Sequence, residues 1–249
     1  MTNLIFLHGL LGTRSDWQKL IEMLPHFRCM AIDLPYHGSE KNTPIQNFDD
    51  VSQFLSNKIY SMVGNEPYFL IGYSLGGRLA LHYTLSEKVK KHNLQAVVLE
   101  GANFGLQNEQ EKQQRWLNDQ YWANRFMQES AHHVLNAWYQ QSVFSHLTVK
   151  QRNKLIEKRT PNCGRNIGKM LLATSLAKQP DFSTKVRSNS SMFFYFCGEW
   201  DHKFQTMAVQ HQLNLTLIPN AGHNAHLENP NDFAKSLIEL INKYKCEKR

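Results

Sequence analysis

The stretch FLIGYSLGGRLALHY, residues 69–83, decides how this chain folds. An apolar run breaks into Gly-Tyr-Ser-Leu-Gly-Gly and continues with a helical pattern. A Gly-x-Ser-x-Gly motif between a strand and a helix sets the serine on a sharp, strained turn, where small residues let two backbones pass closely. The stretch therefore predicts strand, turn and helix, with Ser74 as a candidate nucleophile. A glycine-rich turn without chemistry is the alternative interpretation.

Short apolar runs alternate with helical patterns on both sides of this stretch. Strands are predicted in LIFLHG (residues 4–9), LQAVVLEG (94–101), SMFFYFCGEWD (191–201) and LNLTLIPNAGH (213–223). In RCMAIDLPYHG (28–38) the predicted strand ends at Asp33, and a loop with Pro35 and Gly38 follows. Helices are predicted in FDDVSQFLSNKIYSMV (48–63), GGRLALHYTL (76–85) and the closing segment PNDFAKSLIELINKY (230–244). This alternation is typical of βαβ units, and it predicts an α/β fold with a mostly parallel central sheet flanked by helices.

The pattern changes between residues 101 and 180. The segments NEQEKQQRWLNDQYWANRFMQ (108–128) and AHHVLNAWYQQ (131–141) are amphipathic and rich in Trp, Gln and Arg, and no convincing strand is found there. We therefore expect a core formed by residues 1–100 and 181–249. Residues 101–180 are expected to be inserted into it as a helical cap.

The composition argues against several classes of protein. The 249 residues carry a formal net charge of +7, but the lysines are dispersed and form no long basic stripe, which argues against nucleic-acid binding. A basic balance fits an anionic small substrate equally well. No uncharged apolar stretch reaches the roughly 18 residues of a membrane span, and the N-terminus lacks the basic segment of a signal peptide. The four cysteines, among them Cys163, have no zinc-like spacing, so we expect a cytoplasmic protein without a metal.

A serine hydroxyl needs a base, and after an elbow of this kind an acid and then a histidine follow along the chain. Asp201 ends the strand-like run FFYFCGEWD, and His223 follows LTLIPNAG. Both loops leave the carboxyl ends of strands, where open α/β sheets place their sites. We predict that Asp201 orients the imidazole of His223, which takes up and returns protons. Glu199 and His226 are the rival acid and base.

Two backbone amides are expected to face the negative charge that develops during the reaction. One belongs to Leu75, directly after the serine, and the other to Leu10 in the loop LHGLLGT, residues 7–13. His8 in the same loop is expected to brace the turn rather than to act as a second base.

Arg78 lies four residues after Ser74, so both fall on the same side of the predicted helix. A guanidinium recognises carboxylate or phosphate, whereas an ordinary esterase pocket is mainly apolar. The insertion adds Arg115, Arg159 and Trp138, and the indole offers a wall for a ring or a carbon chain. A structural ion pair for Arg78 and an exposed surface position for the other arginines are the alternatives. Three more arginines of the insertion compete for the same role, namely Arg125, Arg152 and Arg165.

The segments LHGLLGT, AIDLPYHGSE, GYSLGGR, CGEWD and NAGHNAHLENP together resemble the α/β-hydrolase family, in the same order and over nearly the whole chain. The resemblance implies the α/β-hydrolase fold for the core. Members often begin with an antiparallel hairpin ahead of the LHG strand, whereas this chain begins almost on that strand. We therefore expect this hairpin to be shortened or absent and the sheet to be shorter at one edge.

A narrower resemblance runs through the insertion. The segments GYSLGGR, EGANFGLQNEQEKQQRWLNDQYWANRFMQES, AWYQQSVFSHL and MLLATSLAKQPDF are similar to the 2-succinyl-6-hydroxy-2,4-cyclohexadiene-1-carboxylate synthase family of menaquinone biosynthesis. This resemblance implies that Arg78, Arg115 and Arg159 contact substrate carboxylates and that Tyr73 and Trp138 line the site. It also implies that pyruvate is eliminated, without a cofactor, from a cyclohexene bearing succinyl, carboxylate and enolpyruvyl groups. We expect a monomer.

The residues leave other functions open. In a carboxylesterase or thioesterase with an anionic substrate, the same triad would be acylated at Ser74. A non-catalytic binding protein on this fold is a third hypothesis, although a binder has no need of Ser74, Asp201 and His223 together. In the lyase, a base must remove an acidic ring proton near the succinyl ketone, and the sequence does not decide whether His223 does so directly or through Ser74.

Overall fold

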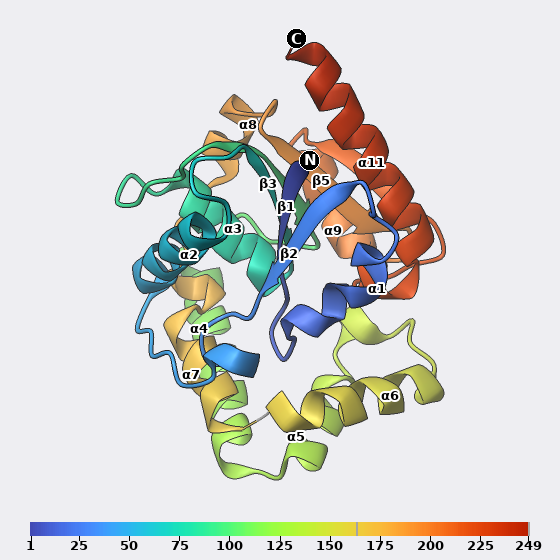
Figure 1. The fold of residues 1–249 in the computed structure, drawn as a ribbon. Coiled ribbons are helices and arrows are strands. Elements are labelled where there is room, and N and C mark those ends of the chain that lie inside the picture. The colour runs from blue at the N-terminus through green and yellow to red at the C-terminus, as the bar shows by residue number, and fades with distance from the viewer. Residues whose placement is uncertain (163, 249) are drawn as a thin grey trace.

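The computed structural model describes residues 1–162 and 164–248, so Cys163 lies outside the described residues. Its centre is a six-stranded sheet in the order β2-β1-β3-β4-β5-β6, and each neighbouring pair is parallel (Figure 1). The strands are β1 (Thr2–Leu7), β2 (Phe27–Ile32), β3 (Tyr68–Tyr73), β4 (Leu94–Glu100), β5 (Phe193–Gly198) and β6 (Asn214–Ile218). The predicted α/β fold with a parallel sheet is confirmed.

The two edges of the sheet are β2 and β6. β2 pairs only with β1, and no other described strand lies beside it. The hairpin that often precedes the first strand is therefore absent from the described part of the chain, as the sequence predicts.

The central strands are apolar on both faces because successive side chains point to opposite sides of the sheet. In β1, Ile5 and Leu7 belong to one apolar cluster, whereas Leu4 and Phe6 belong to another. The first cluster includes residues of α2 (Phe48–Val63), α3 (Leu75–Leu85) and α9 (His202–Gln210), and the second includes residues of α1 (Gln18–Ile21) and α11 (Pro230–Glu247). Figure 1 shows α2 and α3 on one side of the sheet and α1 and α11 on the other.

Polar caps fix where the long core helices begin. The side chain of Asn47 accepts a hydrogen bond from the Asp50 amide at the start of α2, and Asn229 does the same for Asp232 in α11. Pro230 stands in the first turn of α11, where its missing N–H costs nothing. The predicted helices over residues 48–63 and 230–244 are confirmed, and the second continues to Glu247.

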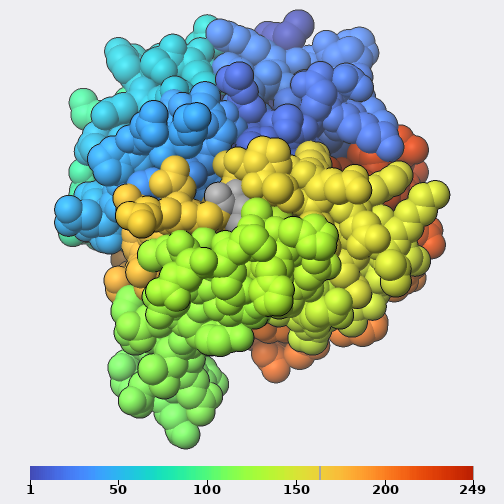
Figure 2. All heavy atoms as spheres, turned by 90° about the horizontal axis from the view of Figure 1, so that it is seen from below, coloured from blue at the N-terminus to red at the C-terminus, as the bar shows by residue number. Residues whose placement is uncertain are grey.

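The described chain between β4 and β5 is helical. It forms α4 (Glu109–Gln128), α5 (Ala131–Trp138), η3 (Ser142–Phe144), α6 (Val149–Arg159), η4 (Thr160–Asn162), α7 (Arg165–Ala173), η5 (Leu176–Lys178) and α8 (Ser183–Ser188). Residues of α4 to α7 share an apolar cluster of their own, which Leu11 of the core joins. Figure 2 shows this segment, green to yellow, spread over the end of the molecule toward which the strands run. The boundaries of the cap at residues 101 and 180 stay a prediction.

The turn between β3 and α3 has the strained geometry that its motif predicts. Ser74 has a φ of 49°, in the left-handed region that side chains rarely adopt. Its amide donates a hydrogen bond of 2.8 Å to the Glu100 carbonyl of β4. A Cβ at Gly76 would lie 2.4 Å from the Leu7 carbonyl oxygen, so α3 can approach β1 this closely only with glycine. The turn holds Ser74 at the carboxyl end of the sheet.

Candidate active site

The structure brings Ser74, Asp201 and His223 together at the ends of three strands. Oδ2 of Asp201 lies 2.6 Å from Nδ1 of His223, and Nε2 of the same imidazole lies 3.4 Å from Oγ of Ser74. Asp201 and His223 are buried, whereas Ser74 is half-buried. A histidine held by a carboxylate on one side and facing a hydroxyl on the other can move a proton to and from that hydroxyl.

The rival acid and base lie elsewhere. Glu199 is exposed, and its carboxylate accepts a hydrogen bond from the Asn220 amide instead of facing an imidazole. His226 is fully buried with Glu100, whose carboxylate lies 2.7 Å from Nδ1, and the imidazole stacks on Trp17. The second histidine–acid pair therefore belongs to the core beneath the elbow.

The two residues whose amides are predicted to hold a developing negative charge line the same cavity as Ser74. Leu10 and Leu75 both line it, and Leu75 begins α3, so its N–H belongs to the helix turn whose amides lack partners within the helix. His8 joins its own loop, after β1, to the loop after β2, because its Nε2 accepts a hydrogen bond from the Leu34 amide. This agrees with the expected bracing role. Burial lowers the pKa of His8, which keeps this imidazole neutral and able to accept.

Arg78 is a buried cation with neutral hydrogen-bond partners. Its guanidinium donates to the Thr174 carbonyl at 2.9 Å and to Oε1 of Gln179 at 3.3 Å. No carboxylate among the described residues lies within ion-pair distance of it. Burial, followed by the nearby charge of Arg115, lowers the pKa of Arg78 to about 9, so the group is still charged at neutral pH. An unpaired buried charge is costly, and an anionic ligand would compensate it.

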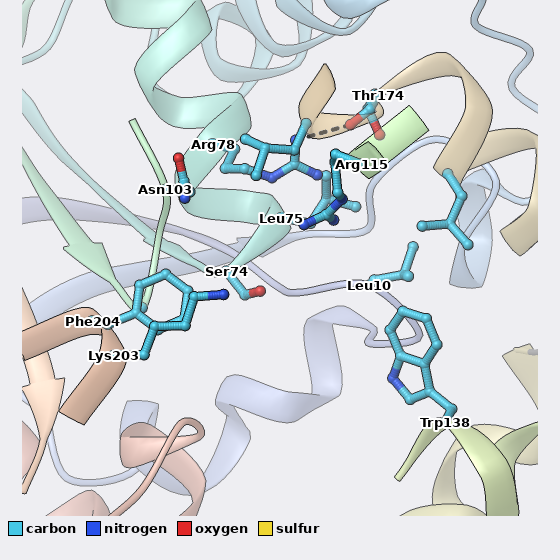
Figure 3. A pocket seen from close by; sticks show the side chains of 13 residues that line it. Leu10, Ser74, Leu75, Arg78, Asn103, Arg115, Trp138, Thr174, Lys203 and Phe204 are labelled. Carbon is cyan, nitrogen blue, oxygen red and sulfur yellow. Dashed lines mark hydrogen bonds between the residues drawn. The ribbon is translucent and has the colours of Figure 1, made fainter. Parts of the chain in front are cut away.

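The cavity beside Arg78 has a volume of about 120 Å³ and three cations on its wall. Arg115 is half-buried and pairs with Asp119 at 2.8 Å, whereas Lys203 forms no ion pair with any described residue. Partial burial and then the Arg115 charge lower the pKa of Lys203. Figure 3 shows Arg78 and Arg115 on one side of Ser74, Lys203 on another, and Trp138 across the cavity.

A second, smaller cavity of about 50 Å³ is also bordered by Ser74. Arg159 borders it, but this guanidinium donates to Asp16 at 2.7 Å, and Lys158 lies 2.8 Å from the same carboxylate. Burial alone would raise the pKa of Asp16, but the two cations hold it well below its ordinary value. Predicted wall residues border this cavity as well: Tyr73 lines it, and Trp138 lines both cavities.

Two charged residues of the site, Lys203 and Asp16, were not predicted from the sequence. Lys203 follows the predicted acid by two positions, and this closeness in sequence was an available signal. Asp16 had none, because 143 residues separate it from Arg159. No group of three or more metal-binding side chains occurs in residues 1–162 and 164–248. Within those same ranges, every helix is too short or too polar to cross a bilayer.

The site combines a nucleophile elbow, an acid and a histidine at the ends of parallel strands. A comparison of the sequence with known families agrees with this arrangement. The model described as the alpha/beta hydrolase fold matches residues 2–230. The chain belongs to the α/β-hydrolase fold family. This match covers the elbow, the acid and the histidine of the site.

Within the α/β-hydrolases, the chain belongs with relatives named as one kind of enzyme. A Yersinia pseudotuberculosis protein named 2-succinyl-6-hydroxy-2,4-cyclohexadiene-1-carboxylate synthase is 40% identical, with 98% of this chain and 88% of the relative aligned. A Haemophilus influenzae protein, provisionally named as the same synthase, is 61% identical over 97% of this chain and 98% of its own length. These names support an enzymatic function for this α/β-hydrolase.

Two solved structures share the α/β-hydrolase architecture. MenH from S. aureus superimposes with a TM-score of 0.87 and 24% identity, covering 98% of this chain and 94% of that one. A thermophilic esterase from Thermogutta terrifontis superimposes with a TM-score of 0.79 and 18% identity, covering 98% and 90%. At these identities the likeness establishes the fold alone, and one fold can host different activities.

Proposed function

We propose that this chain is a lyase of menaquinone biosynthesis that eliminates pyruvate from 2-succinyl-5-enolpyruvyl-6-hydroxy-3-cyclohexene-1-carboxylate. The product is 2-succinyl-6-hydroxy-2,4-cyclohexadiene-1-carboxylate. The observation that carries the proposal is Arg78, a buried guanidinium with no carboxylate partner among the described residues, beside the candidate nucleophile. The names of the relatives point to the same reaction.

Charge matching supports a polycarboxylate as the substrate. The proposed substrate carries carboxylates on the ring, on the succinyl arm and on the enolpyruvyl group. Arg78, Arg115 and Lys203 border one cavity beside Ser74. Charge-assisted hydrogen bonds to guanidinium groups are strong in such partly desolvated settings. A neutral ester would leave the Arg78 charge uncompensated.

The chemical step is a proton removal that drives loss of the leaving group. The base takes the proton from ring carbon 2, next to the succinyl ketone, and those electrons form the C2–C3 double bond. The former C3–C4 double bond becomes C4–C5, the C5–O bond breaks, and enolpyruvate departs. Enolpyruvate then gains a proton on carbon and becomes pyruvate, so atoms and electrons balance.

The triad supplies the base. Ser74 borders both cavities, whereas His223 borders only the smaller one. With the ring in the larger cavity, the Ser74 hydroxyl is the nearer group and passes the proton to Nε2 of His223, 3.4 Å away. Asp201 holds the imidazolium that forms. The amides of Leu10 and Leu75 would stabilise the enolate, and one such donor is worth about 3 kcal/mol in related chemistry.

A pyruvate-release assay tests the proposal. The purified chain is mixed with the enolpyruvyl substrate, and pyruvate is followed through its reduction by lactate dehydrogenase. We expect pyruvate release in the wild type and a loss of at least about a thousandfold in Ser74→Ala. A burst of ester cleavage at Ser74 with no pyruvate would instead establish an esterase. Activities unaffected by Ser74→Ala would favour a binding protein.

A further inference from the structure

Glu228 holds both ends of the short segment that carries His223. Its carboxylate accepts a hydrogen bond of 2.8 Å from the Gly222 amide and one of 3.1 Å from the Asn224 amide. These are the two residues on either side of His223. Because the carboxylate is nearly buried, it needs such partners, and the segment gains two charge-assisted hydrogen bonds.

The cap reaches the same carboxylate through His146. This residue lies between η3 and α6, and its Nε2 is 3.0 and 3.1 Å from the two oxygens of Glu228. The imidazole also packs on the backbone of Gly222, where a Cβ would lie 2.2 Å from Nε2. A side chain at position 222 would therefore displace the His146 imidazole from its present place.

A second contact joins the same part of the cap to the catalytic imidazole. Phe144, in η3, lies edge-on to His223 with ring centroids 6.1 Å apart. Phe144, His223 and Asn224 all border the smaller cavity beside Ser74. The cap segment from η3 to His146 thus packs against His223 and also contacts Glu228, which holds the loop of His223.

We propose that Glu228 is a positioning residue for His223 and that His146 transmits the placement of the cap to it. The carboxylate fixes the backbone on both sides of His223, so the imidazole stays aligned between Asp201 and Ser74. When the cap is seated, His146 adds its hydrogen bond and stabilises that alignment. Proton transfer is therefore efficient when the cap covers the substrate.

The test compares Glu228→Gln with a matched control, Glu199→Gln. Glutamine has nearly the shape of glutamate, but its NH₂ group would face one of the two amide N–H groups and repel it. We expect Glu228→Gln to lower kcat for pyruvate release about tenfold or more, with KM within about twofold of wild type, since small misplacements of reacting groups cost this much. The Glu199 carboxylate also accepts one amide of the loop, from Asn220, but does not hold His223, so its variant keeps wild-type kcat.

A double-mutant cycle tests the part played by the cap. His146→Phe keeps a ring against Gly222 and removes the donor, whereas His146→Gln keeps a donor. We expect His146→Phe to lower kcat about threefold, His146→Gln to restore part of the loss, and His146→Phe to have no further effect in Glu228→Gln. Additive effects would overturn the link between His146 and Glu228.

The kinetic arm rests on the proposed function, so a second readout is independent of the substrate. The NMR resonances of the His223 imidazole should shift in Glu228→Gln and, less, in His146→Phe, while those of His226 stay in place. Folded variants with unchanged His223 resonances and unchanged kcat would overturn the inference. If the wild type releases no pyruvate, the proposed function fails while the imidazole resonances still decide this inference. If Glu228→Gln does not fold, His146→Phe decides it by the same two measurements.

Discussion

Two buried arginines line the two cavities that Ser74 borders, and their surroundings differ. Arg159 has the carboxylate of Asp16 at 2.7 Å, whereas Arg78 donates its hydrogen bonds to the Thr174 carbonyl and the Gln179 amide oxygen and has no carboxylate partner among the described residues. The protein itself compensates the first charge. The second is left to be compensated by whatever anion enters the cavity.

This difference indicates that Arg159 serves mainly to hold the cap on the core, whereas Arg78 serves mainly to bind an anion. The Asp16–Arg159 pair joins the end of α6 in the cap to the 3-10 turn η1 (Arg14–Trp17), and Asn162 adds a hydrogen bond of 2.6 Å to the Gly12 carbonyl. These contacts dock the cap on the loop that carries Leu10. Arg159 lines the smaller cavity, but it is paired with Asp16, so we expect its loss to affect stability most. Arg78 should affect binding most.

The largest expected effect separates the two arginines by substitution with methionine. Arg78→Met should lower kcat/KM for pyruvate release about a hundredfold or more, because a desolvated partner of a substrate carboxylate is lost. Its free energy of unfolding should stay within about 1 kcal/mol of wild type, because an unpaired buried charge is removed. Arg159→Met leaves the buried Asp16 carboxylate with Lys158 as its one remaining cation among the described residues. We expect this variant to lose about 3 kcal/mol of unfolding free energy, measured by urea denaturation. A loss of stability in Arg78→Met together with a loss of kcat/KM confined to Arg159→Met would contradict these roles.

Asp16→Asn sharpens the same contrast through pH. The pKa of Asp16 in the folded chain lies below its ordinary value, so its ion pair stabilises the fold at pH values above that ordinary range. The contribution is lost as pH falls through the folded pKa. We expect Asp16→Asn to be less stable than wild type by about 3 kcal/mol at pH 7, with the gap shrinking below about pH 4. A gap that stays constant with pH in urea denaturation would contradict the assignment.

The sequence predicts one of these arginines better than the other, for physical reasons. Arg78 follows Ser74 by one helical turn, so local periodicity alone predicts that it leans toward the cavity. The environment of Arg159 depends on how the cap docks, and no local pattern encodes a contact with Asp16. The elbow, the sheet and the order Ser74, Asp201, His223 are likewise set by strand–turn–helix patterns that act over short range.

Long-range packing decides the rest. His226 lies three residues after His223, and their partners separate the two: His223 lies between Asp201 and Ser74, whereas His226 is paired with Glu100 and stacked on Trp17. Lys203 lies on the first turn of α9, and it lines the same cavity as Arg115, which belongs to α4 of the cap, 88 positions earlier in the sequence. Such contacts arise from the three-dimensional arrangement of elements far apart in sequence, which composition and periodicity do not specify.

The loss of kcat/KM on replacing Arg115 should lie between the losses on replacing Arg78 and Arg159. It borders the larger cavity, but it is half-buried and shares its charge with Asp119. We therefore expect Arg115→Ala to lower kcat/KM for pyruvate release about tenfold, less than Arg78→Met. Arg125 offers a matched control, because it pairs with Glu129 four residues on in the same helix and lines neither cavity. Equal losses in Arg115→Ala and Arg125→Ala would show that helix stability is being measured.

Among the three cations that line the larger cavity, Lys203 should show the smallest kinetic effect when it is replaced. Its ammonium is more exposed than the Arg78 guanidinium, so water and salt screen its attraction for a carboxylate. We expect Lys203→Met to raise KM about threefold at low salt, with the difference fading as ionic strength rises. A salt-independent loss in kcat would instead give this residue a part in the chemical step.

Titration calorimetry with succinate tests the central claim most directly. Succinate carries the carboxylate of the substrate's succinyl arm, and its binding needs no turnover. We expect the wild type to bind succinate, Arg78→Met to weaken the affinity at least about tenfold, and Arg159→Met to weaken it less. An affinity unchanged in Arg78→Met, with the loss confined to Arg159→Met, would contradict the assignment of Arg78 as the cation that awaits the substrate.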